Sequence, residues 1–504
     1  MRKIIIIVFI GIALLFNSCS ADFLEKYNPT QLDEGNFFLT EDQFEQALNG
    51  VYGQLQGYIG SQWPFTEYIS DNTTVHFNIS DRGQGPSLEA IEYFQIVPGT
   101  GNISSLYNNI YSSLGNINNT LKKLSDSGID DDVRANFEGQ LKFFRAFYYF
   151  ELVRFFGDVI IVTEPINSPE EAYTFSRSPA SDVYDLIEGD LNFAISSLPD
   201  PGSISSSEIG RISKGAALSL LGKVYLTKKQ YGDAVSTLNQ VLNMGYSLMP
   251  NYADVFDPEN KNNAESILEI QYQADSDLGE WSGFIYNFYP RESYGAVINY
   301  SGANGGGWNI PTLDLINFYE EGDLRKEVSL SEGYTNTDGV WVPVPFITKY
   351  FHEDSYTVRG RLGNNWPVIR YADVLLMLAE AINEQSGPED AYRFLNPLRE
   401  RAALAPLDNL DKESFREAVL RERRIELAFE NHRWFDLKRT MSPSELSTFL
   451  NEHGAREREN PTTSRGPVPF SPGDYIFEPY EVLFPIPHAQ ILINENLTQN
   501  EGYN

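Results

Sequence analysis

The pattern of apolar and polar residues predicts helices over much of the chain. Residues 137–156 are apolar on nearly every side, which predicts a buried helix that ends at Gly157. A second helix is expected to start at Ser178-Pro179, and its apolar side consists of Val183, Ile187, Leu191, Ala194 and Leu198. Asp411 is expected to cap a third helix. The charged side of that helix, at 421–426, predicts either exposure to solvent or ion pairs with other helices.

Two segments share the residue spacing of a tetratricopeptide helix pair. Each has a small residue, Gly222 or Ala379, twelve positions before an alanine, Ala234 or Ala391. Small residues at these positions let two antiparallel helices approach closely, while larger neighbours fill the gaps. We therefore predict one helix pair in each segment. The second helix of the later pair is expected to start at 387–390.

Residues 245–366 break the helical pattern. They are rich in glycine, proline, asparagine and aromatic residues, with only short strand-like runs at 266–273 and 340–350. Within them, segment 279–308 holds eight large aromatic residues and seven glycines. A glycine-rich segment forms a poor core by itself, so its aromatic residues are candidates for exposed positions. A second irregular stretch covers 71–101.

The N-terminus has the features of a secretion signal. Arg2 and Lys3 precede an apolar run at 4–16, which is too short to span a bilayer, since a spanning helix needs about 20 residues. Cys19, the only cysteine, follows directly. We predict that 1–18 are removed and that Cys19 becomes the lipidated first residue of a bacterial lipoprotein. The alternative is an ordinary secreted protein. One cysteine excludes a disulfide within the chain.

The charge of the chain excludes several partners. There are 38 Lys and Arg residues against 70 Asp and Glu residues, giving a net charge of −32. Such a surface repels nucleic acid and anionic lipid, so we expect no nucleic-acid partner and a membrane contact through the lipid alone. A polyanionic ligand is disfavoured for the same reason, and Arg82 and Arg291 are the cations that would reverse this.

Six parts of the chain carry a more specific pattern. They are NSCSADFLE at 17–25, FLTEDQFEQALNGVY at 38–52, RAFYY and LVRFFGD within 145–158, PVIRYADVLLMLAEA at 367–381, ERRIELAFE and RWFDLKR within 422–439, and the end at 485–503. Together they resemble the SusD/RagB family, surface lipoproteins of the Bacteroidetes that act in glycan uptake. The resemblance implies a mainly α-helical fold, in which four tetratricopeptide-like helix pairs form a scaffold and an irregular half packs on it.

The resemblance also implies a location and a partner. Members of the family sit on the outer face of the outer membrane, over a SusC-like, TonB-dependent transporter. The expected regions are a removed signal at 1–18, an N-terminal helical region at 19–250, and a C-terminal region at 251–504. The last contains the irregular insert 251–366 and helices at 367–439.

Two positions depart from the family pattern. Asn431 replaces the usual glycine, and asparagine also tolerates a left-handed turn, so we expect the helix end there to be kept. The family often has tryptophans in the stretch that matches 71–101, where this chain has only His76 and Phe77.

Sugar recognition requires aromatic faces for stacking and polar groups for hydroxyls. Trp281 and Trp308 are expected to supply faces, extended by Tyr286, Tyr289 and Tyr294. The other loop is expected to contribute Phe77, Asn78, Asp81 and Arg82. For each aromatic residue the alternative is packing of the irregular half onto the helices. Four residues of the 433–439 motif are expected to be structural: Arg433, Trp434, Asp436 and Arg439.

We predict a non-enzymatic protein that captures oligosaccharide or polysaccharide and delivers it to the transporter. The sequence has no His-Glu-x-x-His motif, calcium loop, phosphate loop or Gly-x-Ser-x-Gly elbow, so we expect no metal, no cofactor and no catalytic residue. Among 70 acidic residues no glycosidase pair stands out. The alternatives are peptide capture by the same fold, a protein-interaction scaffold, and a hydrolase. The acidity of the chain favours a neutral polysaccharide.

Overall fold

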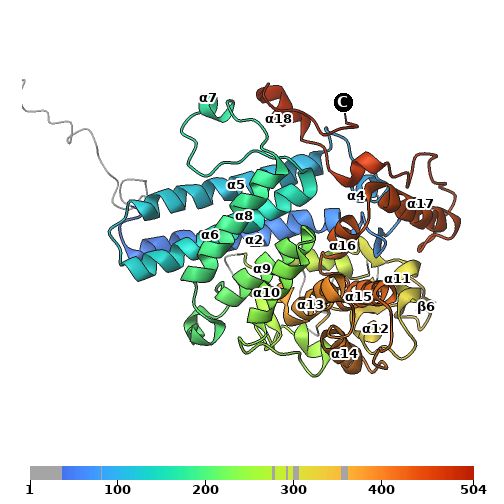
Figure 1. The fold of residues 1–504 in the computed structure, drawn as a ribbon. Helices are drawn as coiled ribbons and strands as arrows, with labels where there is room; N and C mark the ends of the chain where they lie inside the picture. Colours follow the sequence, from blue (N-terminus) through green and yellow to red (C-terminus); the bar gives the residue numbers. More distant parts are fainter. Residues whose placement is uncertain are drawn as a thin grey trace, which may run out of the picture.

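Helices dominate the computed structural model, which describes residues 37–80, 82–274, 279–290, 293, 295–298, 306–352 and 361–503. Figure 1 shows the long helices packed side by side, with the irregular segments gathered below and beside them. In the described residues the main helices are α2 (Glu41–Gln62), α5 (Gly101–Ser125), α6 (Asp131–Phe156), α8 (Ala180–Ser197), α9 (Lys214–Thr227), α10 (Tyr231–Val241), α13 (Tyr371–Ser386), α14 (Tyr392–Arg401), α15 (Lys412–Glu426), α16 (Arg433–Thr440) and α17 (Pro443–Glu459).

Shorter helices connect these elements. They are α3 (Pro64–Glu67), α4 (Gly85–Glu92), α7 (Pro169–Ala172), α11 (Leu313–Phe318), α12 (Arg325–Ser329) and α18 (His488–Ile493). Within the described part of the chain, none of the helices is both long and apolar enough to cross a membrane.

The predicted ends of the longer helices are confirmed. Helix α6 ends at Gly157, whose φ of 71° is readily adopted only by glycine. Helix α8 buries its predicted apolar side and starts at Ala180, one residue later than expected, because Pro179 is its N-cap instead of its first residue. The Asp411 side chain accepts a hydrogen bond from the Ser414 amide and so caps α15. The mainly helical fold expected from the sequence is therefore present.

The two predicted helix pairs are α9 with α10 and α13 with α14. Gly222 of α9 allows the close approach of α10, because a Cβ added there would lie 2.3 Å from Cδ2 of Leu238. One predicted boundary is wrong. Helix α14 starts at Tyr392 and not at 387–390, since the Ala391 amide bonds to the Pro388 carbonyl and closes a tight turn first.

Short antiparallel strands pair the irregular segments. The pairs are β1 (Thr73–Val75) with β3 (Asn309–Pro311), β2 (Ser266–Ile270) with β8 (Trp366–Arg370), β4 (Leu330–Ser331) with β7 (Phe346–Ile347), and β5 (Tyr334–Thr335) with β6 (Trp341–Val342). The strand-like run at 266–273 contains β2, and the run at 340–350 contains β6 and β7. Strands β1 and β3 join the two irregular stretches that were expected to carry the ligand site.

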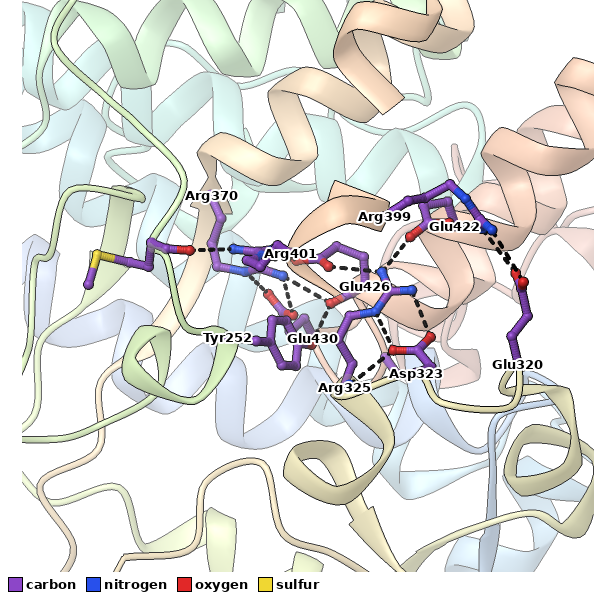
Figure 2. A network of polar contacts seen from close by, with 12 residues as sticks. Tyr252, Glu320, Asp323, Arg325, Arg370, Arg399, Arg401, Glu422, Glu426 and Glu430 are labelled. Carbon is purple, nitrogen blue, oxygen red and sulfur yellow. Dashed lines mark hydrogen bonds and ion pairs between the residues drawn. The ribbon is translucent and has the colours of Figure 1, made fainter. Parts of the chain in front are cut away.

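A buried ion network holds the irregular half against α15. Figure 2 shows Glu426 at its centre, where the carboxylate accepts hydrogen bonds from Arg401 at 2.6 Å, Arg370 at 3.1 Å and Arg325 at 3.2 Å. Arg370 also bonds to Glu430, at 2.7 Å. Of the two predicted roles for the charged side of α15, ion pairing is the one observed, because Glu426 is fully buried. A buried charge is tolerated only when it is paired in this way.

The motif at 433–439 is structural, as predicted. Trp434 is fully buried and stacks on Phe484 with the ring planes 8° apart. Arg433 pairs with Asp71 at 2.7 Å. Just before the motif, Asn431 has a φ of 67°, which confirms the left-handed turn expected there.

Candidate functional site

A cavity of about 380 Å³ lies where three distant segments of the chain meet. The segments are 76–79, which follows β1, the hairpin of β5 and β6, and 464–466. The cavity is lined by His76, Phe77, Asn78, Ile79, Tyr334, Val342, Val344, Ser464, Arg465 and Gly466. Apolar surface beside hydroxyl, amide and guanidinium groups is the composition that a sugar-binding site requires.

The segment 76–79 is positioned by the strand pair beneath it. The His76 amide donates a hydrogen bond to the Trp308 carbonyl at 2.9 Å, which extends the pairing of β1 with β3. On the inner side, the Val75 amide and the Thr74 hydroxyl both donate to the buried carboxyl group of Glu92. Residues 76–79 therefore leave a fixed strand at the protein surface.

The Glu92 carboxyl group is itself unusual. Burial raises its pKa to about 8, although hydrogen bonds from Thr74, Tyr475 and Val75 act in the opposite direction. At neutral pH the group is therefore mostly protonated, and it supports the base of the site without adding a negative charge.

Phe77 lies among cations instead of offering an open face. It is 7% exposed, and the guanidinium groups of Arg82 and Arg465 lie 4.4 Å and 4.3 Å from its ring centre. Arg82 also forms an ion pair with Glu89. Asn78 is half-buried, and its side-chain oxygen accepts a hydrogen bond from the Ser80 amide at 2.9 Å. The structure thus places Phe77 and Asn78 in the lining of the cavity, whereas Arg82 contacts the Phe77 ring and is not part of that lining.

The β5–β6 hairpin contributes residues that the sequence analysis did not single out. Tyr334 and Val342 are cross-strand partners and line the cavity. Trp341 alternates with Val342, so its side chain leaves the opposite face of the hairpin, where it is 55% exposed. The only signal in the sequence is a tryptophan within a short strand-like run, which fits a buried strand equally well.

Three aromatic residues predicted to bind ligand are packed inside the protein. Trp308 is 3% exposed, Tyr286 is 7% exposed and Tyr289 is 1% exposed. The Tyr289 hydroxyl donates a hydrogen bond to the Tyr350 carbonyl at 2.9 Å. In this conformation the three rings pack the irregular half, which was the alternative interpretation, and they present little surface to a ligand.

Trp281 occupies a different position. It is half-buried, and the guanidinium group of the exposed Arg361 lies 5.0 Å from its ring centre. It does not line the cavity described above. Tyr294, Asp81 and the expected lipidation site Cys19 lie outside the described residues, so their roles stay predictions.

Two family models match the chain, one in each half. The model of the SusD family matches residues 327–503. A model described as starch-binding and associating with the outer membrane, of the SusD-like class, matches residues 22–226. The two matches lie in the two halves in which the specific motifs were found.

Known proteins match over nearly the whole length. SusD-like protein P2 of Formosa agariphila is 29% identical, and the match covers 99% of each chain. A SusD superfamily structure from Parabacteroides distasonis is 26% identical, covers 94% of this chain and 100% of its own, and gives a TM-score of 0.75. The structure of a laminarin-binding SusD-like protein is 27% identical, covers 92% and 100%, and gives a TM-score of 0.73.

The sequence motifs, the fold and these matches agree along the whole chain. The resemblance seen at 38–52, 145–158, 367–381 and 422–439 falls within the matched regions or within the full-length alignment. The protein therefore belongs to the SusD/RagB family.

Proposed function

We propose that this protein is a non-enzymatic, cell-surface lipoprotein that captures glycans and passes them to a SusC-like, TonB-dependent transporter. The observation that carries the proposal is the cavity at 76–79, which combines apolar walls with the polar groups of Asn78, Tyr334 and Arg465. The laminarin binding of a structural relative that shares the fold supports a carbohydrate as the ligand.

A glycan chain is longer than this cavity and would extend across its edge. Trp341 is exposed on the other face of the same hairpin, where a sugar ring can stack on the indole. In this proposal the cavity holds one or two sugar units through hydrogen bonds, and Trp341 holds the continuing chain. Binding at such an open surface is modest in affinity, because water is poorly excluded.

The proposed location follows from the N-terminus and the family. Cys19 would carry the lipid, and the outer membrane would be reached through that anchor, as the description of one matching family model suggests. The net charge of −32 gives no electrostatic attraction to an anionic membrane surface.

Affinity electrophoresis of residues 22–504 against a panel of polysaccharides tests the proposal. The expected result is retardation by at least one polysaccharide, weaker in Asn78→Ala and in Trp341→Ala. Tyr173→Ala is the matched control, since Tyr173 is a 43% exposed aromatic residue beside α7, away from the cavity lining.

The possible outcomes separate function from location. Retardation that is lost only in Trp281→Ala would keep glycan binding and move the site to segment 279–290. Absence of retardation by every polysaccharide would contradict glycan binding by this chain.

A further inference from the structure

The lining of the cavity differs in charge from the rest of the protein. Acidic residues outnumber basic residues by 70 to 38 in the chain, yet among the described residues none of the ten that line the cavity is an Asp or Glu. The only formally charged side chain among them is that of Arg465. The charge carried by these lining residues is therefore positive, whereas the chain as a whole is strongly negative.

Arg465 is held in place by aromatic groups. Its guanidinium carbon lies 4.3 Å from the ring centre of Phe77 and 4.1 Å from that of Phe470. Nη1 donates a hydrogen bond to the Tyr93 hydroxyl at 2.6 Å, and Nε donates to the Val468 carbonyl at 3.4 Å. These contacts fix the plane of the guanidinium group without neutralising its charge.

The charge of Arg465 has no counter-ion in the part of the chain that the structure describes. None of its contacts there is an ion pair with a carboxylate, and Nη2 has no hydrogen-bond partner. Its neighbour Arg82 differs, because Glu89 pairs with it. A half-buried, immobilised guanidinium group with an open nitrogen is prepared to bind an oxyanion.

On the basis of the proposed glycan-binding function, we infer that the cavity takes an acidic glycan, and that Arg465 binds its carboxylate or sulfate group. Asn78 also lines the cavity, where it would meet neighbouring hydroxyls of the same sugar. This reverses the expectation of a neutral ligand, which followed from the average charge of the chain. The average charge gives no information about a cavity whose described lining residues include no acidic side chain.

Isothermal titration calorimetry on residues 22–504 tests the inference with three classes of polysaccharide: neutral glucans, uronate polymers and sulfated polymers. The variant is Arg465→Gln, which keeps most of the side-chain volume and removes the charge. The matched control is Arg393→Gln on α14, an exposed arginine that changes the net charge equally. Arg465→Lys, which keeps the charge and loses the planar fork, is a second variant for the case in which the first folds poorly.

The expected result is binding of a uronate or sulfated polymer that weakens about ten-fold or more in Arg465→Gln, less in Arg465→Lys and not in Arg393→Gln. The difference in affinity between the unaltered protein and Arg465→Gln is also expected to shrink as NaCl is raised, because salt screens the attraction between Arg465 and the anionic group. Whichever polymer binds identifies carboxylate or sulfate as the recognised group.

Three results would contradict the inference. Binding of neutral glucans alone would overturn it and leave the proposed glycan-binding function intact. Equal affinity of Arg465→Gln and the unaltered protein for the acidic polymer would overturn the role of Arg465. Binding of no polysaccharide of any class would overturn the proposed function as well.

Discussion

Replacement of Glu426 by glutamine tests whether the buried ion network holds the irregular half to the scaffold. The change keeps the size of the side chain and removes the negative charge that Arg401, Arg370 and Arg325 share. Loss of one partner from a buried ion pair costs about 3–5 kcal/mol. The guanidinium groups keep other partners, since Arg370 still bonds to Glu430 and Arg325 to Asp323. We therefore expect a loss at the low end, about 3 kcal/mol.

The pH dependence of this loss has a definite sign. Burial alone would raise the pKa of Glu426, but the charges of Arg401, Arg370 and Arg325 outweigh burial and hold it well below its ordinary value of 4.5. A carboxyl group with a lowered pKa stabilises the fold above the unfolded-state pKa, and that contribution is lost as the pH falls. The difference between the unaltered protein and Glu426→Gln is therefore expected to be full at pH 7 and to shrink below about pH 4.

Urea unfolding followed by circular dichroism measures the effect. The control is Glu417→Gln, the same substitution at an exposed position of the same helix, with an expected change within about 0.5 kcal/mol. A loss below about 1 kcal/mol in Glu426→Gln, or a loss equal to that of the control, would refute the structural role given to the network.

Three further predictions concern the scaffold and the site. Gly222→Ala is expected to lower the free energy of unfolding by about 1–3 kcal/mol in the same urea assay, because the new Cβ would lie 2.3 Å from Leu238 Cδ2. Helix propensity alone would make this variant more stable, so a gain of stability would contradict the close helix contact. Between pH 5 and 8 the folded state keeps a proton on Glu92 that the unfolded state loses. As the pH rises through this range, the free energy of unfolding is therefore expected to fall by up to about 1.4 kcal/mol per pH unit because of this group. In urea unfolding of Glu92→Gln, the free energy of unfolding should lack this dependence on pH. Identical slopes against pH in the variant and the unaltered protein would contradict a buried, protonated Glu92. Trp341→Ala is expected to weaken glycan binding about three- to ten-fold in calorimetry while leaving stability nearly unchanged, and a large loss of stability would instead make Trp341 a packing residue.

The helical scaffold could be predicted because its signals are local. The end of α6 depends on Gly157, and the start of α15 depends on a cap at Asp411. Each of these residues forms its hydrogen bond with a partner no more than four residues away in the sequence. The close contact at Gly222 followed from a spacing within one helix pair. Such features require only the helical period and the chemistry of single residues.

The candidate site could be predicted only in part, because its residues are far apart in the chain. Phe77 and Asn78 were identified by their position in an irregular stretch. Arg465 was not, since it meets Tyr93 across 372 residues of sequence, and no local pattern reports that contact. Tyr289 was expected at the surface for the converse reason, because its partner, the Tyr350 carbonyl, is 61 residues away.

The most direct test of the account is a crystal structure of residues 22–504 with an oligosaccharide cut from the polysaccharide that binds best. The sugar is expected to occupy the cavity, within hydrogen-bonding distance of Asn78 and Arg465. A sugar bound elsewhere, with the cavity between 76–79 and 464–466 empty, would contradict it.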